Sequence, residues 1–475
     1  MKRILQAILV GALAASPALA ADTAMPKGAE PWSERAIVSH LSFERYAADP
    51  TLLDELIAHG ERLFSAKFTV PDGAGRPMAT QAIVPTKKRR KTPSAFSRTA
   101  GMDANSCASC HHEPVIGGSG PFTANVFVSE GFESADFDSL NPQFSNERNT
   151  VLLQGSGLIE LLAREMSADL KAIRARALKQ ARDTGKPVTA KLHSKGVSFG
   201  ALTVRPDGMV DLAKIDGVDT DLVVRPFSQK GVFASLRQFT INAMNDHHGM
   251  QASERYGLRW TGSRDFDEDG VVDELTPGDI SALVAFQATL PPPVRRAGLP
   301  PRWAEAAKRG EALFAEIGCA SCHRPALPLR SLVFADPGPL DAAGTLRPGD
   351  VEKPIRIDLA TRKWAASLPR NDKGEIMVPL FGDLKRHRIA DKKNDRLGNE
   401  LLGQRFVDRD VFITAELWGV GSTAPYGHRG DLTTLSEAID AHGGEAAPVT
   451  GKWRALDATD RAAMIAFLRS LVIAP

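Results

Sequence analysis

The sequence of 475 residues has few cysteines, no long hydrophobic run and little net charge. All four cysteines belong to two short motifs, so no thiol remains for a disulfide or a nucleophile. No apolar stretch is long enough to cross a bilayer, so no membrane span is expected. The net charge of +2 predicts no general attraction to nucleic acid. With 43% hydrophobic and 24% charged residues, the composition is that of a soluble globular protein of two or three domains.

The first twenty residues have the pattern of a signal peptide. Lys2 and Arg3 precede an apolar segment over 4–15, and Ala20 ends a small-x-small cleavage site. The mature protein is therefore predicted to begin near Ala21 and to be released into the periplasm. Removal of Lys2 and Arg3 lowers the formal charge from +2 to 0.

One five-residue motif, Cys-Ala-Ser-Cys-His, occurs at 107–111 and again at 319–323. C-x-x-C-H is the attachment signature of c-type haem: the thiols bond to the porphyrin vinyls and the histidine ligates the iron. A single copy is also compatible with chance, half a zinc site or a redox dithiol. Two copies behind an export signal predict two covalently bound haem c groups. The attachment residues would be Cys107, Cys110, Cys319 and Cys322, and the iron ligands His111 and His323.

The sequence around the two motifs is duplicated. Gly-Glu-x-Leu-Phe precedes them at 60–64 and 310–314, and two later runs, 276–290 and 457–471, share Asp, Ala, Phe and Leu in register. All four segments have helical periodicity. A glycine within a helix costs about 1 kcal/mol, so we expect each glycine to allow close approach of the later helix.

The predicted fold is mainly α, with two cytochrome c-like haem domains packed together. The N-terminal domain carries large insertions that include some β structure. The predicted boundaries are a signal peptide at 1–20, an N-terminal domain at 21–290, a Pro-rich linker at 291–301 and a C-terminal domain at 302–475.

The insertions distinguish the N-terminal domain. The insertion at about 166–258 is predicted to contain a helix over Ala168–Arg182 and strand-like turns near Val204–Leu222. The basic run Lys87–Lys91 indicates a solvated loop, with docking of an acidic electron-transfer partner as the alternative. Large additions to a small cytochrome scaffold favour an enzyme.

The function depends on the sixth ligand of each iron. Strong-field side chains on both irons imply electron transfer, whereas an open or displaceable position implies chemistry on a small oxidant. For the first iron the candidates are His247 and His248, as displaceable ligand or as the base that moves a proton of bound peroxide. Met250 is a further candidate ligand. The alternative is that both histidines lie in a solvent-exposed loop.

Three C-terminal segments carry a family resemblance together with the two motifs. They are Leu380–His387, Leu417–Gly430 and Glu437–Ala446. The chain resembles the bacterial di-haem cytochrome c peroxidase superfamily and, within it, the di-haem oxidoreductase branch. The resemblance covers most of 300–475 and is thinner over 50–290. It implies that the second haem passes electrons and that the first meets hydrogen peroxide.

The resemblance also implies roles for several side chains. His442 stands where relatives have the Met or Tyr that ligates the second iron, so a His323/His442 pair is expected. The alternative for His442 is a loop histidine bonded to backbone. His428 is expected near a haem propionate or the domain interface, and His387 near the second haem.

Family peroxidases place a carboxylate in the peroxide pocket. Glu160 and Glu165 lie in the corresponding region and are the candidates here. A separate acidic run, 265–273, has the D-x-D-x-D-G-x-x-D beginning of a calcium loop, although Thr276 replaces the usual closing glutamate. The alternative is a plain acidic turn that caps the helix beginning at Thr276. The predicted calcium ligands are Asp265, Asp267, Asp269 and Asp273.

The leading hypothesis is a periplasmic di-haem oxidoreductase of peroxidase type. Hydrogen peroxide or a related oxidant would react at the N-terminal haem, and electrons would come from a small cytochrome c or cupredoxin through the C-terminal haem. The alternatives are a di-haem electron-transfer cytochrome and a ferryl-type modifier of a partner protein's side chains. The sequence leaves open whether the protein forms a homodimer.

Overall fold

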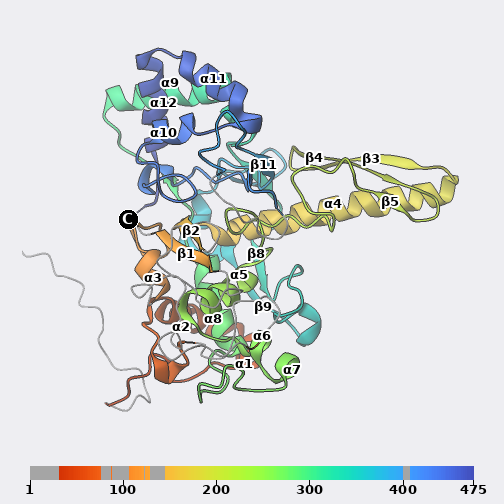
Figure 1. Cartoon of the computed structure of the whole chain (residues 1–475), viewed down its shortest axis with the longest axis vertical. Helices are drawn as coiled ribbons and strands as arrows, with labels where there is room; N and C mark the ends of the chain where they lie inside the picture. The colour runs from red at the N-terminus through yellow and green to blue at the C-terminus, as the bar shows by residue number, and fades with distance from the viewer. Residues whose placement is uncertain are drawn as a thin grey trace, which may run out of the picture.

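The structure, a computed structural model, describes residues 32–75, 87, 106–121, 123–128, 145–398 and 407–474 (Figure 1). The predicted signal peptide, 1–20, and most of the basic run, 88–91, lie outside the described residues. Within the described part of the chain, no helix is both long and apolar enough to cross a membrane.

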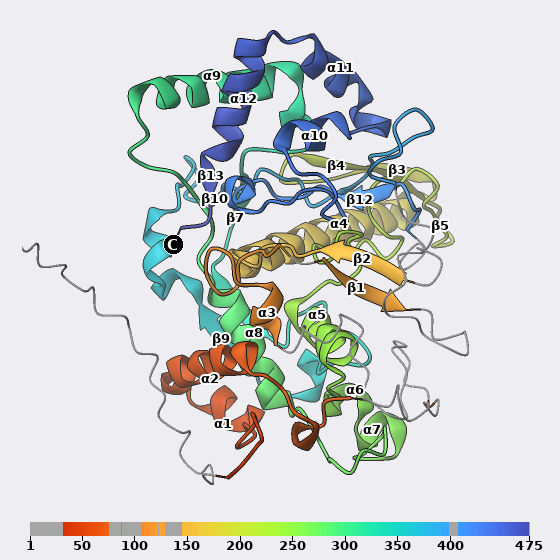
Figure 2. The ribbon, with the colours of Figure 1, turned by 60° about the vertical axis from the view of Figure 1, so that its left-hand side comes forward.

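Two crossed helix pairs occupy opposite ends of the molecule (Figures 1 and 2). Near one end, α2 (Leu53–Ser65) packs on α8 (Pro277–Thr289), and near the other, α9 (Pro301–Ile317) packs on α12 (Ala458–Arg469). The glycines predicted to allow close approach lie at both crossings. A Cβ on Gly60 would lie 1.9 Å from the carbonyl oxygen of Ala282, and one on Gly310 would lie 2.0 Å from that of Ala463.

The remaining helices are mostly short. Serine or threonine side chains cap several of them, as at Ser235 before α5 and Thr434 before α10. The segment η4 is a π-helix and directly continues α5. These helices are α1 (Phe43–Ala48), α3 (Cys107–Cys110), α4 (Ser156–Thr184), α5 (Leu236–Ala243), η4 (Met244–His248), α6 (Ser253–Tyr256), α7 (Leu258–Thr261), α10 (Leu435–Asp440) and α11 (Ala447–Ala455).

The strands form small antiparallel sheets. The three-stranded sheet is β3 (Val188–Ser194), β4 (Val197–Val204) and β5 (Val210–Asp211). The two-stranded sheets are β1 (Thr123–Val128) with β2 (Ser145–Asn149), β6 (Val294–Arg295) with β13 (Leu471–Val472), β7 (Leu327–Leu329) with β10 (Ile376–Val378), β8 (Val333–Asp336) with β9 (Ile355–Asp358), and β11 (Arg386–Arg388) with β12 (Val411–Ile413). The fold is therefore mainly α with small sheets.

The long helix α4 and the three-stranded sheet form an arm that projects to the side (Figure 1). The helix predicted over 168–182 lies inside α4, which is longer at both ends. The region 204–222, predicted to form strand-like turns, contains β5, which pairs with the end of β4, whereas most of the sheet is formed by 188–204. Leu192, Phe199 and Leu202 are buried and belong to the same hydrophobic cluster as α4, which explains the pairing.

The larger hydrophobic cluster extends across the predicted linker. It joins the N-terminal helices to buried residues from 327 to 384, whereas a smaller cluster surrounds Phe314 and Phe467. The C-terminal part of the chain therefore contributes to both clusters. The domain boundaries at 290 and 302 stay a prediction.

Candidate functional site

Both Cys-Ala-Ser-Cys-His motifs begin with one turn of helix, α3 for the first and the 3₁₀ turn Cys319–Ser321 for the second. The hydroxyl of Ser106 accepts a hydrogen bond from the backbone N–H of Ser109 and caps α3. All four cysteines are partly buried and form no disulfide. The geometry is suited to presenting two sulfurs to one edge of a planar group.

The two motif histidines have matching polar environments. The Nδ1 of His111 lies 3.3 Å from the carbonyl oxygen of Gly118, and that of His323 lies 3.3 Å from the carbonyl oxygen of Phe381. Burial lowers the pKa of each imidazole to about 4, so both are neutral. With the Nδ1 proton donated to a carbonyl, Nε2 carries the lone pair that binds a metal.

The two histidines also have matching aromatic neighbours. Phe64 lies 6.3 Å from His111 at an interplanar angle of 53°, and Phe314 lies 6.4 Å from His323 at 54°. Each phenylalanine also contacts a phenylalanine of the crossing helix, Phe286 or Phe467. The structure therefore repeats the surroundings of the motif as well as its sequence.

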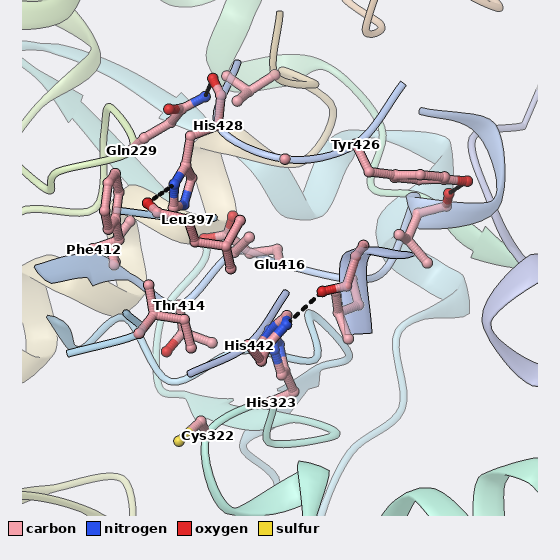
Figure 3. A pocket seen from close by; sticks show the side chains of 18 of the residues that line it. Gln229, Cys322, His323, Leu397, Phe412, Thr414, Glu416, Tyr426, His428 and His442 are labelled. Carbon is pink, nitrogen blue, oxygen red and sulfur yellow. Dashed lines mark hydrogen bonds between the residues drawn. The ribbon is translucent and has the colours of Figure 1, made fainter. Parts of the chain in front are cut away.

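A cavity of about 390 Å³ lies beside the second motif and is lined by Cys319, Cys322 and His323 (Figure 3). His442 lines the same cavity, and its ring centroid lies 6.3 Å from that of His323. The Nδ1 of His442 donates to the carbonyl oxygen of Ala438 at 2.7 Å, which leaves its Nε2 as the metal-binding nitrogen.

These residues fit a haem. A metal bound by two imidazole nitrogens at about 2.0 Å each holds the ring centres roughly 6 Å apart, and the separation of His323 and His442 agrees. The thiols of Cys319 and Cys322 line the same cavity, as attachment through the vinyl groups requires.

His428 forms part of the cavity wall and stacks on Phe412, with ring centroids 3.5 Å apart (Figure 3). Its Nδ1 donates to the carbonyl oxygen of Leu397 at 3.0 Å, and burial lowers its pKa to about 3. The carbonyl oxygen of His428 accepts hydrogen bonds from the backbone N–H of Asn149 and the amide of Gln229. His428 thus joins the cavity to strand β2 and to the segment before α5.

Three carboxyl groups near the second motif are not among the site residues predicted from the sequence. Asp383, in the motif that carries the family resemblance, accepts a hydrogen bond from His387 at 2.9 Å, and Glu445 accepts one from the other ring nitrogen at 2.8 Å. Glu416 lines the cavity, and burial raises its pKa to about 7. Only the position of Asp383 four residues before His387 offered a sequence signal.

Beside the first motif, the structure brings His248 to an attachment cysteine. The Nε2 of His248 lies 3.5 Å from Sγ of Cys107, and its ring lies 5.5 Å from that of Phe68. His248 is 3% exposed. His247 and His248 end the π-helix η4, and neither is exposed, which disagrees with the alternative of a solvent-exposed loop. Such π-turns are frequent at functional sites. Met250 is fully buried just after it.

The two candidate carboxylates of α4 are held in ion pairs. Glu160 is buried and binds Arg164 at 2.6 Å and the backbone N–H of Leu236 at 2.8 Å. Glu165 binds Lys195 and Arg330. The contacts given for Glu160 and Glu165 among the described residues do not include His247 or His248.

Three of the four predicted calcium ligands cluster. Asp265, Asp267 and Asp269 each place a carboxylate oxygen within 4.8 Å of the others. Asp273 does not join them, because its carboxylate binds the guanidinium of Arg264. The assignment of Asp273 as a calcium ligand stays a prediction. The neighbouring Glu274 is buried instead.

The family described as "Di-haem oxidoreductase, putative peroxidase" matches residues 375–471, which confirms the resemblance stated from the sequence. The chain matches no curated protein. Hydrazine synthase of Kuenenia stuttgartiensis is 14% identical, with 99% of this chain and 100% of that chain covered and a TM-score of 0.37. A MauG-like protein associated with microbial copper homeostasis is 14% identical, with 66% and 88% covered and a TM-score of 0.27. At these TM-scores, neither structure supports an argument about fold or function.

Proposed function

We propose, from the premise that residues 375–471 belong to the di-haem oxidoreductase family, that the protein is a periplasmic di-haem c-type peroxidase. Hydrogen peroxide would be reduced at the haem held by the first motif. The electrons would come from a small cytochrome c or cupredoxin and reach that haem through the haem held by the second motif. The net reaction takes one peroxide, two electrons and two protons to two waters. Bound haem would supply the one-electron chemistry and the site at which peroxide is activated.

The surroundings of the two motifs differ, and this difference supports a peroxide-reducing role for the first motif and an electron-transfer role for the second. Across the cavity, His323 faces His442 at a separation of 6.3 Å, an arrangement that leaves no room for peroxide and suits electron transfer. On the first side, His248 is held at the end of a π-helix next to Cys107. Single π-helical turns of this kind are rare and occur frequently at functional sites.

His248 is the residue we propose to act on peroxide. Its Nε2, which points toward Cys107, would accept the proton of the incoming peroxide and return it to the departing oxygen. General acid–base help of this kind contributes roughly 10²–10⁴ in rate. We assign no role in this step to Glu160 or Glu165, since Glu160 is paired with Arg164 and Glu165 with Lys195.

A second candidate is a di-haem electron carrier. His248 is buried beside Cys107, and if it ligated the first iron permanently, both irons would be closed. A peroxidase and a closed electron carrier can be distinguished by whether the spectrum of the ferric protein responds to peroxide and that of the reduced protein to carbon monoxide.

The test uses the mature protein with both haems attached. We expect two haems per chain, oxidation of a pre-reduced small cytochrome c on addition of peroxide, and a loss of roughly 10² or more in kcat/KM for His248→Ala. His193→Ala is the matched control, because His193 is exposed on strand β3, and should retain the full rate. Two low-spin haems that respond to neither peroxide nor carbon monoxide would overturn the proposal in favour of the carrier. Oxidation of a partner protein's side chains without turnover of the cytochrome would favour the third hypothesis.

A further inference from the structure

An acidic loop connects α7 to α8, at the end of the molecule away from α9 and α12 (Figure 1). Asp265, Asp267 and Asp269 converge there, with one oxygen from each within 4.8 Å of the others. Two oxygens bound to the same calcium ion, each at about 2.3–2.6 Å, lie at most roughly 5 Å apart. Gly270, at φ +93°, makes the sharp turn that folds the loop back.

The loop contains a buried charge that the protein itself does not satisfy. Asp267 is 0% exposed, and neither of its carboxylate oxygens has a hydrogen-bond partner. A buried carboxylate without a partner is costly, so this arrangement indicates a missing cation.

Nearby basic side chains do not fill that role. Lys87 binds Glu268, and Arg264 binds Asp273. Both carboxylates are more exposed than Asp267, with Glu268 at 57% and Asp273 at 25%. Among the residues that the structure describes, these two positive charges therefore pair with the rim of the loop and not with Asp267.

Glu274 supplies a fourth carboxylate that the sequence pattern did not indicate. It is 3% exposed, and burial together with the charge of Asp267 raises its pKa well above the ordinary value. Its Oε2 accepts a hydrogen bond from the backbone N–H of Gln251 at 2.7 Å. Asp273, with φ of 50°, instead binds Arg264.

We propose that Asp265, Asp267, Asp269 and Glu274 bind one calcium ion. The donors are all carboxylate oxygens, which suit a hard cation and exclude a zinc or copper preference. Four carboxylates in one loop suit the large, flexible coordination shell of Ca²⁺ better than the small octahedron of Mg²⁺, which keeps most of its water.

Calcium would also fix the chain that follows the π-helix. Glu274 binds the N–H of Gln251, and the carbonyl oxygen of Leu275 accepts from the N–H of Ser253 at 2.9 Å. On its other side this segment is anchored through Gly249, whose carbonyl oxygen accepts from Gly75. Calcium removal should therefore loosen residues 249–253 as well as the loop itself.

The experiment compares Ca²⁺ binding and thermal unfolding of the haem-loaded protein, first stripped with EGTA. We expect Ca²⁺ to bind and to raise the melting temperature by about 5 °C, with Mg²⁺ much less effective. Asp267→Asn and Glu274→Gln should each lose one equivalent of bound Ca²⁺ in calorimetric titration. Asp273→Asn, the matched control, should bind like the wild type.

A second measurement separates a metal ligand from a merely structural residue. In EGTA, Asp267→Asn should melt at or above the temperature of the wild type, because it removes an uncompensated buried charge. In Ca²⁺ the wild type should melt at a higher temperature than Asp267→Asn. The proposal is overturned if the stripped wild type binds no Ca²⁺, if Asp273→Asn loses the ion while Glu274→Gln keeps it, or if Asp267→Asn is less stable by the same amount in both conditions.

Discussion

The imidazole rings of His323 and His442 face each other across one cavity, with their centroids 6.3 Å apart and their planes at 60°. Each ring has its Nδ1 next to a backbone carbonyl, that of Phe381 or Ala438. The two Nε2 atoms are therefore the nitrogens available to a metal between them. The pair is formed by residues 119 positions apart, because α10 ends just before His442 and directs it back to the motif.

This relationship predicts the spectrum of the second haem. His442→Ala should convert one low-spin ferric signal to high spin and leave the other haem unchanged, whereas His442→Met should keep a low-spin iron and raise its reduction potential by on the order of 0.1 V. Electron paramagnetic resonance and a redox titration measure both effects. His193→Ala provides the control, and an unchanged spectrum in His442→Ala would show that another residue ligates the iron.

The crossing of α9 and α12 predicts a steric effect at Gly310. A Cβ there would lie 2.0 Å from the carbonyl oxygen of Ala463, so the helices must separate. Gly310→Ala should lower the free energy of unfolding by about 1–3 kcal/mol. Gly451 lies within α11 and a Cβ there would meet nothing within 4 Å. Gly451→Ala should therefore raise it by about 0.5–1 kcal/mol. Unfolding in guanidinium measures the free energy of unfolding of both variants. Equal losses of stability in Gly310→Ala and Gly451→Ala would contradict the packing argument.

The sequence predicted these helix crossings because their signal is local and duplicated. Gly60 and Gly310 each lie in a short amphipathic pattern, and the partner helices share residues in register. The link between the C-terminal residues 327–384 and the N-terminal core could not be predicted in this way. It depends on packing between segments far apart in the chain, for which no single segment carries a pattern.

The candidate site was predicted unevenly for a similar reason. The attachment residues follow from spacing alone, and the family resemblance pointed to His442. The π-helix that carries His248 depends on a local change in hydrogen bonding that residue types do not specify. The calcium pattern depends on the spacing of residues and so included Asp273, but the carboxylate of Asp273 binds Arg264, whereas the adjacent Glu274 is buried.

A buried ion network spans the predicted linker and allows a stability prediction. Arg237, 1% exposed, binds Glu254 through two nitrogens at 2.9 and 2.8 Å and Asp336 at 2.8 Å. Arg237→Met leaves two buried carboxylates without their cation and should cost about 3–5 kcal/mol. Arg205→Met, which breaks an exposed pair with Asp207, should cost less than about 1 kcal/mol. Urea unfolding distinguishes the two, and similar small losses would mean that the carboxylates find other partners.

His387 predicts how stability depends on pH. Burial by itself lowers its pKa, but the hydrogen bonds and charges of Asp383 and Cys322 together outweigh burial and raise the pKa to about 11. The pairs with Asp383 and Glu445 persist once Cys322 is bonded to haem and its sulfur carries no charge. A histidine whose folded pKa exceeds its unfolded value of about 6.5 stabilises the fold fully below that pH. The contribution is lost as pH rises toward the folded pKa.

The comparison of wild type with His387→Gln isolates this contribution. We expect the wild type to be more stable by about 2 kcal/mol at pH 6, as is usual for hydrogen bonds to a charged group. The difference should shrink steadily between pH 7 and 10, the window between the two pKa values. His193→Gln, on exposed β3, should follow the wild type at every pH. A difference that stays constant from pH 6 to 10 would mean that His387 is held neutral and acts only through its shape.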